Sequence, residues 1–232
     1  VTDPVRRDSR PAFDPAGRYL YFISARTFDP VQDMQHFDFS FPRGTKPYLI
    51  TLRADLPSPF VPTPKAEEKK DDAEAKTDAS GNGEKDEVAK EEAAKEEAAK
   101  PIQIDLDGIR ERIVAFPVTE GRFIGVQGTR EGVLFAQVPV TGTRNDEWLS
   151  TVPAANASVD YYAFETYKQE RILDGISDFA VTADGKMLLY RAGDRLRVMK
   201  AGEKPPQSDK PGRESGWLVL DRVKVAVRPE TE

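Results

Sequence analysis

The sequence contains no cysteine, and His36 is its only histidine. The absence of cysteine excludes a disulfide framework, a thiol nucleophile and a thiolate metal site. Long apolar runs are also missing, so no segment has the length needed to span a bilayer as a helix, and residues 1–5 do not resemble a signal peptide. We therefore expect no membrane partner. Because the first residue is Val1 and not methionine, we expect the chain to be part of a longer protein.

The negative charge is concentrated in one segment. Residues 65–100 hold thirteen acidic residues and eight lysines, which is a net charge of −5 out of the total of −6. This low-complexity segment has too few apolar residues to offset the entropy of ordering, so we predict a disordered insertion. The remaining chain is nearly neutral, which gives no support for a nucleic-acid partner.

A unit of strand, tight turn and strand occurs twice. Ser9–Ala25 and Ser177–Gly193 align when Gly17 is placed on Gly185, so that Phe22 falls on Tyr190. In each copy the glycine can take the left-handed conformation that the turn requires, and in the first copy the β-branched and aromatic residues of Tyr19–Ile23 follow it. Recurrence of one such unit is typical of a repeat architecture.

Further strands are predicted between and after the two copies. The segments with strand character are Pro47–Leu52, Ile102–Leu106, Ile113–Phe116, Phe123–Gln127, Val133–Val138, Val159–Tyr167, Arg171–Leu173, Leu196–Met199 and Trp217–Val227. Residues 142–153 and 202–215 are predicted loops. In the excursion at residues 27–44, alternating Phe37, Phe39 and Phe41 predict a short strand or a flap that packs its aromatic rings onto the sheet; the alternative is that these rings line a path for peptides.

Consecutive antiparallel strands in groups of four describe the blade of a β-propeller. The fold class is therefore all-β: an arc of about three blades over residues 1–222, with the blades at approximately 5–118, 119–174 and 175–222. The insertion at 65–100 lies within the first blade, and residues 223–232 form an exit strand or linker. Three blades are too few to close a ring, so other blades must lie elsewhere in the protein.

The pattern S-x-P-x-F-D-P-x-G-x-x-L-Y-F from Ser9 to Phe22 resembles the repeats of the TolB and tricorn propellers. More specifically, four segments in this order are similar to the second, seven-bladed propeller of the tricorn protease and its bacterial homologues, which are relatives of the S41 serine peptidases. They are Tyr48–Phe60, Pro101–Val118, Glu131–Phe135 and Ser177–Arg195.

This resemblance implies a non-catalytic propeller segment of a cytoplasmic, homo-oligomeric serine peptidase that degrades peptides. The segment would act as a gate or filter for peptide substrates and as a scaffold for a downstream PDZ domain and peptidase core. The alternative is a periplasmic interaction module of the TolB kind without peptidase activity. Neither reading requires a cofactor.

We assign no catalytic residue and no metal ligand. His36 lacks an accompanying nucleophile motif, which favours a surface or flap histidine over a general base. Candidate substrate-channel residues are arginines in or beside the inner half of the second and third blades: Arg122, Arg130, Arg191, Arg195 and Arg197. They could attract peptide carboxylates or, alternatively, pair with neighbouring acids.

Overall fold

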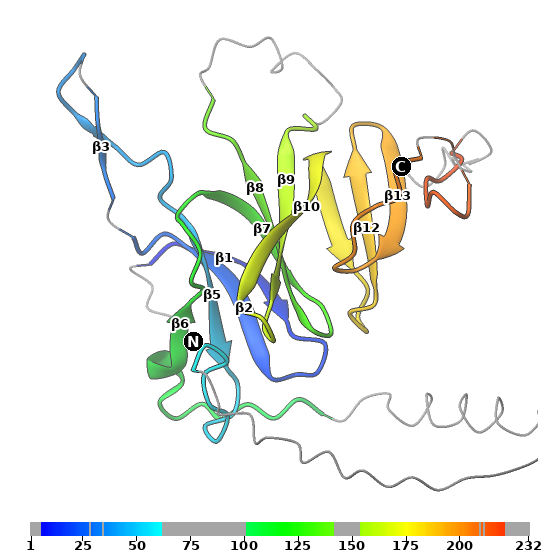
Figure 1. Cartoon of the computed structure of the whole chain (residues 1–232). Coiled ribbons are helices and arrows are strands. Elements are labelled where there is room, and N and C mark those ends of the chain that lie inside the picture. Colours follow the sequence, from blue (N-terminus) through cyan, green and yellow to red (C-terminus); the bar gives the residue numbers. More distant parts are fainter. Residues whose placement is uncertain are drawn as a thin grey trace, which may run out of the picture.

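The structure is a computed structural model that describes residues 6–27, 29–33, 35–61, 101–141, 154–208, 210 and 212–220. Within these ranges the regular structure is antiparallel β-sheet and one 3₁₀ turn, η1 (Ile109–Arg112). The expected all-β propeller arc is confirmed (Figure 1). The predicted insertion at 65–100, the loop at 142–153 and the exit segment at 223–232 lie outside the described residues.

Two sheets have four strands each. The first has the order β1-β2-β5-β6 and the second has the order β10-β9-β8-β7, so sequential strands of each sheet are neighbours. The strands of the first sheet are β1 (Asp8–Phe13), β2 (Tyr19–Ser24), β5 (Lys46–Thr51) and β6 (Ile113–Ala115). Those of the second are β7 (Arg122–Gly128), β8 (Gly132–Val138), β9 (Ala157–Ala163) and β10 (Lys168–Ile176).

The third sheet has three strands and the beginning of a fourth. Its strands are β11 (Asp178–Val181), β12 (Met187–Ala192) and β13 (Arg195–Lys200). Beyond β13 an isolated antiparallel bridge joins Arg197 to Trp217, and the Leu218 N–H donates to the Leu196 carbonyl. Trp217 therefore occupies the place of the outer strand that the sequence predicted from residue 217 onward.

Side chains on the two faces of the second sheet fill the spaces between it and its two neighbours. On β8, Val133 and Phe135 belong to the apolar cluster against the first sheet, whereas Leu134 and Ala136 belong to the cluster against the third. All four side chains are fully buried. The second sheet thus lies between the other two, as each blade of a propeller does, and burial on both of its faces holds the arc together.

The repeated turn has the same hydrogen bonds in both copies. In the first, the Asp14 N–H donates to the Tyr19 carbonyl and the Gly17 N–H donates to the Asp14 carbonyl; Thr182, Met187 and Gly185 repeat both bonds 168 positions later. The two glycines have φ of 68° and 71°, in the left-handed region. The alignment made from the sequence therefore has a structural basis in identical turn geometry.

Two strand predictions differ from the structure: the strand predicted over Val159–Tyr167 ends at Ala163, where a turn leads into β10, and the second difference is at residues 102–106. Residues 102–106 form no strand, although the Asp105 N–H donates to the Leu52 carbonyl. The segment runs as a strap into η1, where Arg112 Nε donates to the Thr51 carbonyl at 3.0 Å and its other nitrogens donate to carbonyls of the strap. The alternation of apolar and polar residues at 102–106 therefore reflects an exposed strap and not a sheet edge.

The excursion between β2 and β5 forms a separate hairpin, β3 (Val31–Gln32) and β4 (Phe39–Ser40). The expectation that its aromatic rings pack onto the sheet was wrong, because Phe37, Phe39 and Phe41 are all exposed. The hairpin stands away from the blades at the upper left of Figure 1. None of the described segments forms a helix with the length and apolarity that a membrane crossing requires.

Candidate functional site

The inner edge of the arc is formed by the first strand of each sheet. β1, β7 and β11 are edge strands in their sheets, and β7 contacts both β1 and β11. The three edges therefore lie side by side, where a propeller has its central channel (Figure 1). Side chains at the two ends of these strands are placed to meet whatever passes along that channel.

The turns that follow these inner strands meet at one end of the arc. A Cβ atom added to Gly185 would lie 2.7 Å from Pro15 Cγ and 2.9 Å from Arg130 N, so turns of all three blades are in contact. Arg130 Nε also donates to the Asp184 carbonyl at 3.3 Å, which joins the second blade to the third.

A shallow cavity of about 440 Å³ lies at this junction of the second and third blades. Its lining combines three cations with two carboxylates and a tyrosine, and these charged and aromatic residues are Arg130, Lys186, Lys200, Glu131, Glu203 and Tyr161. Lys200 pairs with Glu203 at 3.4 Å, and Lys186 pairs with Asp184 at 3.7 Å. These ion pairs balance two of the cations, whereas Arg130 donates to a backbone carbonyl, that of Asp184.

The five candidate arginines do not share one site. Arg122 is the exposed first residue of β7, and Arg130 is exposed in the turn just after that strand, so the two lie at opposite ends of the inner edge. Arg191 lies on β12, the second strand of its sheet, and its Nε donates to the Gly193 carbonyl at 2.6 Å.

Arg195 and Arg197 lie farther from the inner edge, on β13, and both approach Trp217. Their guanidinium carbons are 3.9 Å and 5.0 Å from the centre of the indole ring. Arg197 is buried and donates to the carbonyls of Ser215 and Pro206 and to the Tyr190 hydroxyl. These hydrogen bonds hold the third blade together and leave Arg197 buried, away from the inner edge.

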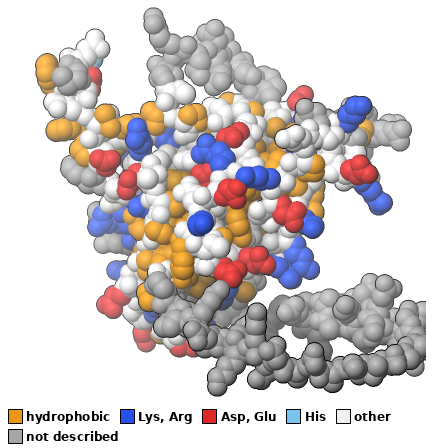
Figure 2. Space-filling model, in the orientation of Figure 1, with side chains coloured by type: hydrophobic (Ala, Val, Ile, Leu, Met, Phe, Trp, Pro, Cys, Tyr) orange, Lys and Arg blue, Asp and Glu red, His pale blue; other side chains and the backbone are white. Residues whose placement is uncertain are grey.

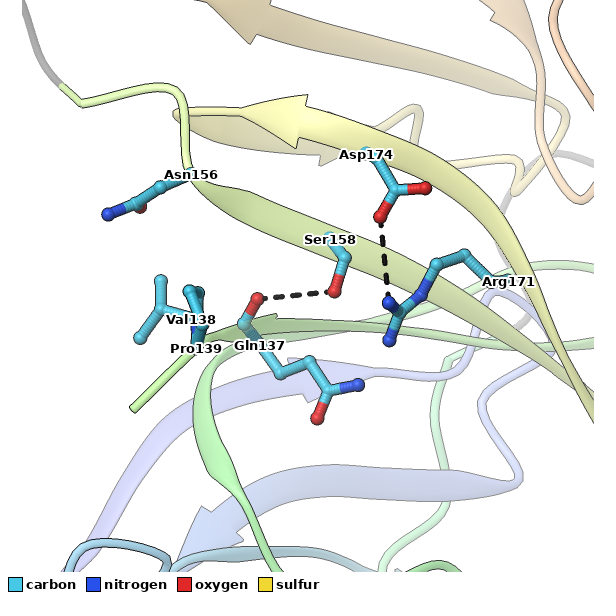
Figure 3. A pocket seen from close by; sticks show the side chains of 7 residues that line it. All are labelled: Gln137, Val138, Pro139, Asn156, Ser158, Arg171 and Asp174. Carbon is cyan, nitrogen blue, oxygen red and sulfur yellow. Dashed lines mark hydrogen bonds and ion pairs between the residues drawn. The ribbon is translucent and has the colours of Figure 1, made fainter. Parts of the chain in front are cut away.

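A second cavity, of about 400 Å³, lies at the other end of the second blade (Figure 3). Residues of β8, β9 and β10 line it, and their side chains are mainly polar: Gln137, Val138, Pro139, Asn156, Ser158, Arg171 and Asp174. Arg171 faces Asp174, with Nη1 3.5 Å from Oδ1, and the Ser158 hydroxyl donates to the Gln137 carbonyl at 3.5 Å.

A buried carboxylate organises the wall of this cavity. The Asp160 side chain is only 4% exposed and accepts hydrogen bonds of 2.8 Å from Gln137 Nε2, Gln169 Nε2 and Arg171 Nε. The hydrogen bond from Arg171 raises the pKa of that guanidinium, so the arginine is charged at any physiological pH. The arrangement fixes amide and guanidinium groups around the cavity, and such groups can bind backbone amides or carboxylates.

Sequence reasoning missed this network. Asp160, Arg171 and Gln137 come from three strands, and no spacing within the chain relates them. The only sequence signal is a carboxylate at an inward position of the apolar strand around Val159, since a buried acid requires hydrogen-bond donors.

His36 has the surface position that its sequence context favoured. The ring is on the exposed hairpin, and Nδ1 lies 3.0 Å from Asp33 Oδ2. The Ser177 hydroxyl accepts a hydrogen bond from the Gly193 N–H at 3.1 Å, a contact with the backbone of the turn after β12. In the described part of the chain, no three metal-binding side chains gather into a possible site.

Comparison with known proteins identifies the family to which this chain belongs. Residues 1–202 match the tricorn protease second beta propeller domain. This chain belongs to that family. The match covers more than half of the sequence and includes all three sheets, and it agrees with the resemblance found in the motifs.

Curated relatives of this propeller are tricorn protease homologues. A tricorn protease homolog of Saccharolobus solfataricus is 30% identical, and the alignment covers 100% of this chain and 18% of that protein. Tricorn protease homolog 1 of Streptomyces coelicolor is 33% identical, with 99% of this chain and 20% of that protein covered. The chain therefore spans about a fifth of the length of these relatives.

A solved structure supports the fold. The crystal structure of the tricorn protease matches with a TM-score of 0.61 and 21% identity, over 86% of this chain and 16% of that one. At this level of identity the likeness concerns the arrangement of strands. The chain is thus a propeller part of a tricorn-like protein.

Proposed function

We propose that this chain is a non-catalytic propeller segment of a tricorn-like serine peptidase, where it admits and filters peptide substrates and supports the catalytic core. The bond-breaking residues belong to other parts of the polypeptide, together with a PDZ domain. The complete protein is a cytoplasmic homo-oligomer in this proposal. Support comes from membership of the propeller family and from relatives that are named as proteases.

The observation that carries the gating role is the position of two arginines on the inner edge. Arg122 begins β7 and Arg130 follows its end, so exposed cations stand at both ends of this strand. Seven strand residues separate such ends by about 20 Å, at roughly 3.3 Å for each residue. A peptide that moves along the channel would meet a cation at each end, and both would attract its carboxylates.

The complete peptidase provides the test. We expect Arg122→Glu and Arg130→Glu to lower kcat/KM for long acidic peptides several-fold, because charge reversal repels them, and to leave cleavage of a short neutral peptide unchanged. Arg110→Glu is the matched control, since Arg110 is exposed on η1 and away from the inner strands.

Two results would contradict the gating role. One is an unchanged kcat/KM for long peptides in both channel variants, and the other is an equal loss for long and short peptides. Added salt should also reduce the difference between wild type and variants, because screening weakens attraction between exposed charges. The isolated segment should show no hydrolysis of either peptide.

A further inference from the structure

The hairpin between β2 and β5 exposes a cluster of large apolar side chains. We call residues 29–43, as far as the structure describes them, the aromatic arm. Exposed fractions are 72% for Phe37, 62% for Phe39, 48% for Phe41 and 47% for Val31. Figure 2 shows hydrophobic atoms gathered on this projecting part of the molecule. Contiguous exposed apolar side chains on a protein surface mark a site of interaction.

The arm has a defined shape. The Asp33 N–H donates to the Asp38 carbonyl at 2.8 Å, and the Asp33 carboxylate accepts from the Gln35 N–H at 2.9 Å and contacts His36 Nδ1 at 3.0 Å. Phe37 takes a φ of 57°, which is rare for a bulky residue and turns the chain at the tip. These contacts fix the turn that presents the aromatic rings.

Among the residues that the structure describes, no further strand pairs with the two strands of the arm. β3 and β4 form a sheet of their own, with Val31 opposite Ser40 and Gln32 opposite Phe39. Phe39 lies on β4 and Phe41 directly follows that strand, and both side chains are exposed. A two-stranded hairpin is marginally stable in water and gains stability when an apolar face is covered.

We propose that the aromatic arm docks onto another domain of the same polypeptide, at an apolar patch rimmed by lysine or arginine. The relatives are about five times as long as this chain, so a domain of that polypeptide is tethered nearby at high effective concentration. The arm carries Asp29, Asp33 and Asp38 against the single arginine Arg43, and these acids complement a basic rim.

The aromatic arm lies away from the channel, so docking of the arm and passage of peptides involve different surfaces. It leaves the first blade between the second and third strands, and in Figure 1 it extends beyond the blades and away from β7 and β11. A peptide in the channel would not pass it. Two arms of two copies would bring like charges together, which opposes direct pairing of arm with arm. The docking role does not depend on the gating role proposed above.

The test places a photo-crosslinking residue in the complete protein. Phe39→p-benzoylphenylalanine should form crosslinks, identified by mass spectrometry, to a segment of the same chain outside the propeller. Leu106→p-benzoylphenylalanine is the control, because Leu106 is 69% exposed on the strap and should not crosslink to that segment. Mixing isotopically light and heavy protein distinguishes crosslinks within one chain from those between copies.

The proposal is overturned if Phe39 crosslinks only between copies, only within the propeller, or to nothing. A second variant measures the contact without a probe. The triple change Phe37→Ser, Phe39→Ser and Phe41→Ser should raise hydrogen exchange at least about threefold in the crosslinked segment and leave exchange in β7 and β8 unchanged. Equal exchange in variant and wild type would also overturn docking. Leu106→Ser serves again as the control.

Discussion

Arg197 and Trp217 close the outer side of the third blade. The guanidinium carbon of Arg197 lies 5.0 Å from the centre of the indole ring, and its nitrogens donate to the Ser215 and Pro206 carbonyls at 2.6 Å each. The Tyr190 hydroxyl accepts from Nη1 at 3.1 Å. One buried side chain thus joins β12, β13 and the segment that holds Trp217.

Replacing Arg197 should destabilise the chain. In Arg197→Met, two carbonyls and a hydroxyl lose a charged donor, and we expect the free energy of unfolding to fall by about 2–4 kcal/mol. Arg197→Lys should restore only part of this loss, because an ammonium group cannot reproduce the fork of a guanidinium. Urea unfolding followed by circular dichroism measures both. Equal stability of wild type and Arg197→Met would show that these bonds contribute nothing.

The blades could be predicted because their signals are local. The turn at Asp14–Gly17, its copy at Thr182–Gly185 and the apolar run Val133–Ala136 of β8 are each contained within a few residues of chain, so each predicts its turn or strand locally. The strap at 102–106 misled the same reasoning. Its alternation is that of a strand, but Arg112 holds the following turn against carbonyls at the end of β5, which leaves the strap as an exposed connection.

The partners of Arg197 and Arg171 could not be predicted, because they are distant in sequence or lie on another strand. Arg197 finds its acceptors at Pro206 and Ser215, and Arg171 is held by Asp160 on the neighbouring strand. The exposure of Phe37 and Phe39 was hidden for a related reason: alternation indicates a strand but does not reveal whether a second surface covers it.

Alanine substitutions at Gly185, Gly108 and Gly212 should distinguish the cost of a left-handed backbone from the cost of steric overlap with neighbouring atoms. Gly185 has φ of 71°, and an added Cβ would meet the backbone of Thr129 and Arg130 at 3.0 Å and 2.9 Å. Gly108 has φ of 64° with no atom closer than 3.9 Å, and Gly212 has neither constraint. Thermal melting should give losses of about 3 kcal/mol for Gly185→Ala, about 1 kcal/mol for Gly108→Ala and none for Gly212→Ala.

The same three melts can contradict this ranking. If Gly185→Ala and Gly108→Ala lose equal stability, contact between the turns of the blades is not what constrains Gly185, and only the left-handed backbone matters.

Tyr21 should make stability depend on alkaline pH. Burial, followed by the neighbouring Asp14 carboxylate, raises the pKa of this phenol well above its ordinary value of about 10. The contribution is fully present below pH 10 and is lost as pH rises through the folded pKa, because only the unfolded state releases the proton readily. The melting temperature should therefore fall above pH 10.

Tyr21→Phe tests this dependence. The variant loses the 3.1 Å hydrogen bond to Asp14, at a cost of about 1 kcal/mol near pH 8, and should show a smaller further loss between pH 8 and pH 11 than wild type. Melting curves at the two pH values measure both effects. An unchanged pH slope would assign the alkaline loss to other groups, such as Tyr19 and Tyr161, whose pKa values are also raised by burial.

The two carboxylates beside Arg171 should contribute unequally to stability. Asp160 is buried and accepts three hydrogen bonds of 2.8 Å, whereas Asp174 is 72% exposed and lies 3.5 Å from the guanidinium. In Asp160→Asn the amide nitrogen cannot accept, so Gln137, Gln169 or Arg171 loses a partner, and we expect a loss of about 2 kcal/mol. Asp174→Asn should cost less than about 0.5 kcal/mol, because water solvates and screens the exposed pair. The urea midpoints of the two variants measure these losses. Equal shifts would mean that burial does not strengthen the ion pair between Asp160 and Arg171.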